Sequence, residues 1–203
     1  GKSADVKLAL ENTTGNPFIT VDLIDNHTLA ELKSINKNTQ GGINLNKEIP
    51  LEGSVADLKT ALSGINYEGN ITIDDSNSST ILATDVNNVS DRTTEKPVIK
   101  NAPTISGSSA NLVTVIGKIT NTGNANFSLD DAHDLTQLTT INGATSGTVT
   151  IKDKTVDLKG DFADLKVALA GITGYQGAVE ILDNGNTLKA SEVETLSKSR
   201  IDK

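Results

Sequence analysis

The chain has 203 residues, with 18 Lys and Arg against 26 Asp and Glu, which gives a formal net charge of -8. An acidic chain lacks the basic stripe that a nucleic-acid partner requires, so we expect no nucleic-acid binding. The chain contains no Cys, which excludes disulfides, a thiol nucleophile and a thiolate metal site. It has no run of about 18 apolar residues, and we therefore expect no direct membrane insertion.

The chain is organised around a recurring stretch, GSVADLKTAL at residues 53–62. It returns at 160–169, in a more divergent form at 107–116, and in a shortened form at 3–10. The equivalent positions Asp5, Asp57, Asn111 and Asp164 are 52, 54 and 53 residues apart, and a fixed period of this kind indicates a tandem repeat. The chain has no Met and starts inside a repeat, so we expect a segment of a longer protein. The predicted boundaries are a partial repeat at 1–26, repeats at 27–79, 80–133 and 134–186, and the start of a further repeat at 187–203.

Each copy of this stretch has the pattern of a helix start. A residue that can cap a helix follows the Gly, namely Ser54, Ser108 or Asp161. Apolar residues then recur with helical spacing, which predicts one buried stripe per helix. The expected stripes are Leu58, Leu62 and Ile65, then Leu112, Ile116 and Ile119, and finally Leu165, Leu169 and Ile172. We call these the B-type helices.

A second helix, called A-type, is predicted before each B-type helix. Thr28 with Glu31, and Ser191 with Glu194, have the spacing of a capping box. The expected buried edges are Leu29, Leu32 and Ile35 in one copy, and Leu135, Leu138 and Ile141 in another.

Short alternating strands are expected after the B-type helices, at 21–23, 71–73, 127–129 and 179–181. Two more strands lie close together before each following B-type helix, for example 149–151 and 156–158. Their short links predict β-hairpins, and Pro50 and Pro103 predict that the second strand begins there or lies at a sheet edge. The expected fold is therefore α+β: two-layer α/β sandwich repeats with units of strand, helix, β-hairpin, helix and strand. Helices cover one sheet face, and neighbouring repeats of the same chain pack closely.

The strands end in four acidic corners, which are the best candidate site. The pairs are Asp25-Asn26, Asp74-Asp75, Asp130-Asp131 and Asp183-Asn184. Hard oxygen ligands suit calcium, and the hypothesis places the ion at Asp25, Asp75, Asp131 and Asp183. The alternative interpretation is that these residues cap the A-type helix that follows and complement its dipole.

Two further pairs recur in corresponding places. His27 and His133 each follow a corner aspartate by two residues, which suits either a metal or pH-sensitive contact, or plain exposed positions. Tyr67 and Tyr175 occupy the same turn in two repeats, where they either stack on a sugar ring or fill the space at the end of the B-type helix. Every notable group occurs more than once, whereas an active site is normally built once. We therefore expect no catalytic residues, no enzyme activity, and no cofactor apart from the calcium considered above.

The phrases TLAELKSIN at 28–36 and LTTINGATSGTVT at 138–150 resemble repeats of very large bacterial surface proteins. These are adhesin-like or motility-associated proteins of marine bacteria and cyanobacteria. The resemblance implies a spacer or surface-display role in a secreted or surface-anchored, extracellular protein that takes part in cell adhesion. The alternative is a module that binds cell-surface glycans or proteins, with or without calcium.

Overall fold

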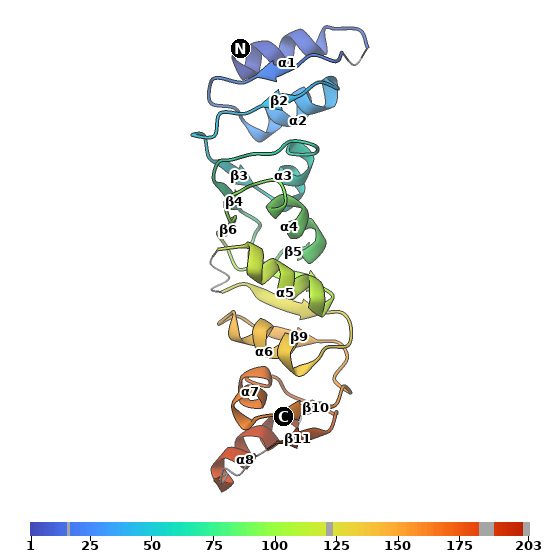
Figure 1. The fold of residues 1–203 in the computed structure, drawn as a ribbon, viewed down its shortest axis with the longest axis vertical. Coiled ribbons are helices and arrows are strands. Elements are labelled where there is room, and N and C mark those ends of the chain that lie inside the picture. The colour runs from blue at the N-terminus through green and yellow to red at the C-terminus, as the bar shows by residue number, and fades with distance from the viewer. Residues whose placement is uncertain (16, 121–123, 183–188, 201–203) are drawn as a thin grey trace. The chain divides into compact units, whose positions relative to one another are not determined.

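The structure is a computed structural model that describes residues 1–15, 17–120, 124–182 and 189–200. Helices alternate with short parallel strands throughout this part of the chain (Figure 1). The chain divides into two compact units, which are described one at a time below. The first comprises Gly1–Ser76, Asp85–Lys100 and Lys118–Asn121, and the second comprises Asn77–Thr84, Asn101–Gly117 and Thr122–Lys203. None of the described helices is both long and apolar enough to cross a membrane.

In the first unit, strands pair in two parallel sheets, β1–β2 and β3–β4–β6. Leu51 of β3 lies opposite Ile71 of β4, and Thr72 of β4 lies opposite Val98 of β6. The elements are α1 (Ser3–Glu11), β1 (Val21–Asp22), α2 (Leu29–Asn38), β2 (Ile43–Asn44), β3 (Leu51–Gly53), α3 (Val55–Ala61), β4 (Ile71–Ile73), β6 (Val98–Ile99) and, from Asp85 onward, α4 (Ala83–Ser90).

In the second unit, the sheets are β5–β7–β8–β9 and β10–β11, and both are parallel. The elements are β5 (Thr80–Leu82), β7 (Thr104–Gly107), α5 (Ser109–Lys118), β8 (Asn126–Leu129), α6 (Leu135–Gly143), β9 (Val149–Ile151), β10 (Leu158–Gly160), α7 (Phe162–Ala168), β11 (Val179–Ile181), α8 (Ala190–Ser197) and the short 3-10 helix η1 (Lys198–Arg200). The last residue of α5, Lys118, belongs to the first unit.

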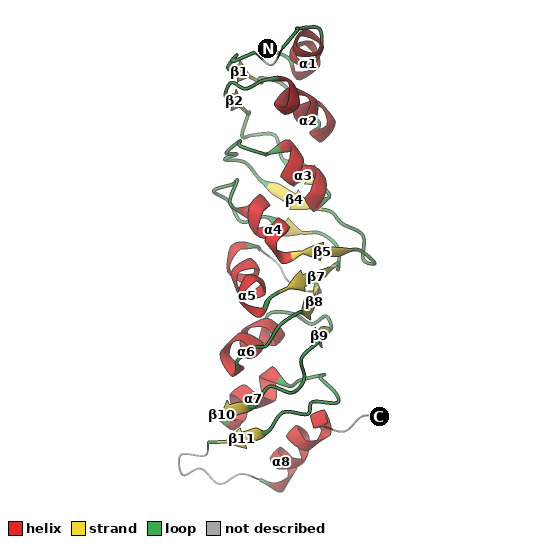
Figure 2. Cartoon of the chain, turned by 90° about the vertical axis from the view of Figure 1, so that its right-hand side faces the viewer, coloured by secondary structure: helices red, strands yellow, loops and turns green. Residues whose placement is uncertain are grey.

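The predicted α/β architecture is confirmed. In each unit helices alternate with strands along the chain (Figure 2). The apolar stripes predicted for α3 and α7 are buried, and so are Leu32, Ile35, Leu138 and Ile141 of the A-type helices α2 and α6. In α5 the buried residues are Leu112, Val115 and Ile119, so that the stripe lies one residue away from the expected Ile116. Along β4 and β8 every second side chain is buried, which matches the predicted alternation.

The predicted β-hairpins are wrong. Every strand pairing in the described residues is parallel, and the two strands of each expected hairpin bond to different neighbours. Thus β2 pairs with β1, whereas β3 pairs with β4 across helix α3. Parallel neighbours need a crossover connection, and α2, α3, α5, α6 and α7 each supply one between two paired strands. Pro50 and Pro103 do stand immediately before β3 and β7, as predicted for strands that begin there.

The helices recur with half the sequence period. Their starts are 26, 26, 28, 26, 26, 27 and 28 residues apart, at Ser3, Leu29, Val55, Ala83, Ser109, Leu135, Phe162 and Ala190. A repeat of 52 to 54 residues therefore holds two helices, an A-type and a B-type helix in alternation. The B-type helices are α1, α3, α5 and α7. The exact repeat boundaries given above stay a prediction.

Most of the predicted helix caps are present. Thr28 with Glu31 forms the predicted capping box on α2, and Asp134 with Gln137 forms one on α6 that the sequence analysis did not predict. Ser54 accepts a bond from the backbone N–H of Asp57 at the start of α3. Asp161, by contrast, makes no side-chain cap on α7, and Ser191 lies inside α8 rather than before it.

Strands β3 and β10 each end in a glycine, at the point where the preceding A-type helix packs against the strand. We call one helix together with the strand beside it a layer. A Cβ atom on Gly53 would lie 2.4 Å from Cδ1 of Leu29, and one on Gly160 would lie 2.3 Å from Cδ2 of Leu135. Real Cβ atoms do not approach so closely, so a larger residue at either position would require the leucine side chain of the preceding A-type helix to move. Gly53 and Gly160 thus leave room for Leu29 and Leu135.

Candidate functional site

One aspartate of each described corner, namely Asp25, Asp75 or Asp131, caps a B-type helix. Oδ1 of Asp25 accepts a hydrogen bond from the backbone N–H of Ser3 at 2.8 Å. Oδ2 of Asp75 accepts from Val55 N–H at 2.8 Å, and Oδ1 of Asp131 accepts from Ser109 N–H at 2.7 Å. Each donor is the first residue of the helix that precedes the corner. The expectation that the corners cap the following A-type helix is therefore wrong for these three, and Asp183 lies outside the described residues.

The reason lies in the parallel topology. A strand that follows a helix runs back alongside the strand that preceded the helix, so its end arrives at the start of the helix. The start of a helix carries free N–H groups and partial positive charge, which a carboxylate stabilises. The bond from Ser3 N–H is the largest reason why the pKa of Asp25 lies below its usual value.

In the two inner corners, Asp74-Asp75 and Asp130-Asp131, the first aspartate pairs with a lysine instead of a helix N–H group. Asp74 lies 3.0 Å from Nζ of Lys100, which also pairs with Glu52. Asp130 lies 2.7 Å from Nζ of Lys152 and accepts a bond from the Ser106 hydroxyl. The Lys152 contact is the main cause that lowers the pKa of the Asp130 carboxyl. These pairs are exposed, and pairs of this kind add little to stability.

In the corners Asp74-Asp75 and Asp130-Asp131, the two adjacent carboxylates thus have separate partners, one a helix N–H group and the other a surface lysine. Within the part of the chain that the structure describes, no three His, Cys, Asp or Glu residues come together as a metal site. The calcium hypothesis at Asp25, Asp75, Asp131 and Asp183 stays a prediction. At Asp25, Asp75 and Asp131, a calcium ion would have to bind a carboxylate that already accepts a hydrogen bond from a helix N–H group.

Both histidines are buried rather than exposed, at 6% for His27 and 3% for His133. Nδ1 of His27 lies 3.1 Å from the carbonyl oxygen of Asp25, an acceptor, so Nδ1 carries the hydrogen. Nε2 of His133 lies 3.1 Å from the hydroxyl of Tyr175. The interpretation of the two histidines as plain exposed positions is therefore wrong.

His133 predicts a loss of stability on mild acidification. Burial lowers the pKa of His133 below its usual value, in spite of the carboxylates of Asp153, Asp131 and Asp134 nearby. The unfolded chain then takes up a proton at a higher pH than the folded chain. The contribution is fully present above the ordinary value of 6.5 and falls as the pH drops through the window below it. We expect urea unfolding to show lower stability at about pH 5.5 than at about pH 7.5.

The matched variant is His133→Gln, which removes the titration. It should be less stable than wild type at neutral pH but should show a flatter pH dependence above about pH 5, where the carboxylates stay ionised. An unchanged slope would show that another group titrates in this window.

The two tyrosines are buried at 1% exposure each, so neither ring is free to stack on a sugar, and that interpretation is wrong. The Tyr175 hydroxyl donates to the carbonyl oxygen of Val156 at 2.7 Å, and the Tyr67 hydroxyl donates to that of Ile49. Burial raises the pKa of Tyr175 to about 12. Both side chains fill the core beside the turn after a B-type helix, as the alternative interpretation predicted.

Two asparagines that the sequence reasoning did not single out hold the other end of the B-type helices. Nδ2 of Asn36, on α2, donates to the carbonyl oxygens of Ala61 and Ser63 at 3.2 and 2.9 Å. Nδ2 of Asn142, on α6, donates to those of Val167, Ala168 and Ala170 at 2.8, 3.0 and 2.9 Å. The recurring dipeptide Ile-Asn at 35–36 and 141–142 was the available signal.

Removal of this amide should loosen α3. We expect Asn36→Ala to lower the free energy of unfolding by about 1 kcal/mol, because carbonyl groups at the end of α3 lose their donor. A thermal melt would then shift down by about 2–4 °C for a chain of this size. The matched control is Asn38→Ala, whose amide bonds to Ser34 within its own helix. Equal losses in the two variants would show that the cap between helices contributes nothing special.

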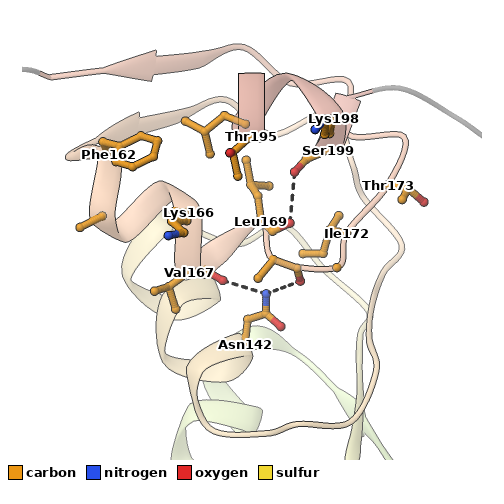
Figure 3. Close-up of a pocket in the computed structure, with 14 residues that line it drawn as sticks. Asn142, Phe162, Lys166, Val167, Leu169, Ile172, Thr173, Thr195, Lys198 and Ser199 are labelled. Carbon is orange, nitrogen blue, oxygen red and sulfur yellow. Dashed lines mark hydrogen bonds between the residues drawn. The ribbon is translucent and has the colours of Figure 1, made fainter. Parts of the chain in front are cut away.

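A hollow of about 1060 Å³ lies between α6, α7 and the α8–η1 segment (Figure 3). Phe162, Val167, Ile172 and Leu196 give it a mostly apolar lining, and Lys166 and Lys198 are the charged residues there. Ser199 and Asn142 also line it, but their polar groups already donate to carbonyl oxygens of α7 and the turn after it. The described lining of the hollow contains no His, Asp, Glu or Cys.

The chain matches no protein-family model, and no curated protein is similar to it in sequence. What the site does therefore rests on its own geometry. In the described residues, the acidic corners, the tyrosines and the asparagines are each bonded to the backbone of another layer. Their common chemistry is the joining of one helix–strand layer to the next.

Proposed function

We propose that this chain is a structural repeat segment, a spacer or surface-display region, of a large secreted or surface-anchored bacterial adhesin-like protein. The observation that supports the proposal most is the repeated use of the corner aspartates. Asp25, Asp75 and Asp131 each bond the start of a B-type helix in the same way. A residue type that recurs at fixed spacing in one structural role suits a load-bearing array better than a single binding site.

Links between helices support the same role. Lys33 of α2 pairs with Asp57 of α3, and Lys59 of α3 pairs with Asp85 of α4. Lys118 pairs with Asp91 after α4. These exposed pairs add little to stability, so the asparagine caps Asn36 and Asn142 are the stronger contacts between neighbouring helices. The neighbouring repeats of the same chain are thus the proposed partners, and an extracellular, cell-surface location is part of the proposal.

Single-molecule stretching between two handles tests the mechanical role. We expect unfolding in discrete steps, each releasing multiples of about 26 residues, or roughly 9 nm of chain. A two-helix repeat would release about twice that length. The pulling series should be run with calcium and again with a chelator, since calcium at the corners would raise the unfolding force only in its presence. A chain that extends smoothly without steps would contradict the spacer role.

A glycan array on the same protein separates the spacer from the binding-module alternative. A spacer should bind no glycan above background, with or without calcium. Specific binding that Asp75→Asn abolishes, in a variant that melts like wild type, would instead favour a binding module that uses the corners.

A further inference from the structure

The two asparagines that join an A-type helix to a B-type helix are followed by different residues. Asn36 is followed by Lys37, whereas Asn142 is followed by Gly143. Asparagine is thermolabile because its side-chain amide can be lost to a reaction with the backbone nitrogen of the next residue. Glycine there hinders that reaction least, because it has no side chain. One structural role is thus filled by a slowly reacting sequence at Asn36 and by a fast one at Asn142.

The reaction is an intramolecular displacement that ends in deamidation. The backbone nitrogen of Gly143 attacks Cγ of the Asn142 side chain, so that a new C–N bond forms and the bond to the side-chain amide nitrogen breaks. The attacking nitrogen gives up its proton, and the amide leaves as ammonia. Water then opens the resulting succinimide ring at either carbonyl group, which leaves aspartate or isoaspartate at position 142. Water is the single co-reactant.

The closed contact between α6 and α7 opposes this reaction. Nδ2 of Asn142 donates to three carbonyl oxygens, those of Val167, Ala168 and Ala170, at 2.8, 3.0 and 2.9 Å (Figure 3). Gly143 is the last residue of α6, so Asn142 lies within the helix. Side chains in a helix lean toward its N-terminus, away from the backbone nitrogen of the next residue. The ring can therefore close only after the end of α6 has unwound and the amide has left its acceptors.

The product of the reaction cannot restore the contact. A carboxylate has no N–H group to donate. It would also face carbonyl oxygens at the C-terminal end of α7, where the helix dipole is negative. Isoaspartate additionally places an extra methylene group in the main chain of α6. The end of α7 thus loses its cap once the amide is gone.

We propose that Asn142-Gly143 is a deamidation site that makes an opening of the α6–α7 contact permanent. While the contact is closed, its hydrogen bonds and the helical backbone protect the amide. Each opening exposes the pair to the reaction, and a chain that has reacted no longer closes with the same cap. Asn36 makes the equivalent contact with the end of α3 but lacks the following glycine. The proposal does not depend on the spacer role proposed above.

Peptide mass spectrometry after incubation at mildly alkaline pH tests the site. Conversion at Asn142 should be about tenfold or more faster in denaturing urea than in buffer, because the reaction follows the population of the open state. Asn36 is the internal control and should keep its amide in both conditions. The other Asn-Gly pair of the sequence, Asn184-Gly185, lies outside the described residues and is read from a separate tryptic peptide.

The matched variant is Gly143→Ala, which should suppress most of the conversion in urea. A Cβ atom on Gly143 would lie 3.5 Å from Cγ1 of Val167, an ordinary contact, so the variant should fold like wild type. Equal conversion of wild type in buffer and in urea would overturn the proposal, since the contact would then give no protection. So would an amide at Asn142 that persists in urea.

Thermal melts test the consequence of the reaction. Asn142→Asp, which reproduces one product, should lower the melting temperature by about 2 °C or more, and at least as much as Asn142→Ala does. The alanine variant loses the donor alone, whereas the carboxylate also repels the carbonyl oxygens of α7. Lys166 lines the same hollow as Asn142. A smaller loss in the aspartate variant than in the alanine variant would show that a lysine compensates the new charge, and would overturn the proposal.

Discussion

Leu58→Asp should unfold the helix α3 layer and weaken the layers on either side of it. Leu58 is fully buried, and a carboxylate at this position would have no partner in the aliphatic core. We expect a loss of more than about 4 kcal/mol, at the extreme end of the range for single substitutions. Because each layer is stabilised by its neighbours, the loss should spread beyond α3. Circular dichroism with a thermal melt would measure the loss, and hydrogen exchange would map its extent.

The matched control is Ala56→Asp, two residues earlier on the same helix and exposed to solvent. It adds the same charge near the helix N-terminus, where the dipole favours it, and should melt close to wild type. Leu165→Asp and Ala163→Asp form the equivalent pair on α7. A Leu58→Asp melt that matches wild type would mean that this helix face does not form the core.

Tyr175→Ala should give the second largest loss. The ring is 1% exposed, and truncation of a buried aromatic side chain leaves a cavity that costs about 3–5 kcal/mol. The hydroxyl donates to Val156 and lies beside Nε2 of His133, so the variant also removes the partners of two buried polar groups. The measurement is urea unfolding at neutral pH.

Tyr175→Phe separates the ring from the hydroxyl. It keeps the packing and removes only the hydrogen bonds, so we expect a loss of about 1 kcal/mol. Tyr67→Phe should behave similarly, because its hydroxyl has the equivalent role beside Ile49. If Phe and Ala variants at position 175 lost the same stability, the hydroxyl rather than the ring would be the main contribution.

Helices and strand positions could be predicted because their signals are local. The stripe of Leu58 and Leu62 follows from helical spacing, and the cap at Ser54 depends on residues three apart. The hairpins failed for a physical reason. Two short strands with a three-residue link between 43–45 and 49–51 have the same local pattern whether they pair with each other or with strands one helix away. The choice depends on partners that are distant in sequence.

The site was only half predictable for the same reason. The corner aspartates could be found, since they recur after the strand that follows each B-type helix, but the helix that they cap could not. Asp75 bonds to Val55, twenty residues earlier, only because β4 returns beside β3. Asn36 was missed because its partners are backbone carbonyl groups at the end of α3 and just after it, and the recurring Ile-Asn dipeptide does not indicate which carbonyl groups its amide reaches.

The sharing of caps between layers has a consequence for how such a chain can grow by gene duplication. The start of α3 depends on Asp75, which follows it, and the end of α3 depends on Asn36, which precedes it. Loss or gain of a single helix would bring two helices of the same type together and leave one without its cap. Copying two helices at once preserves every cap, so in-frame expansions of about 53 residues are the steps that selection can accept. The period in the sequence is then the length of the shortest segment whose duplication keeps every helix capped.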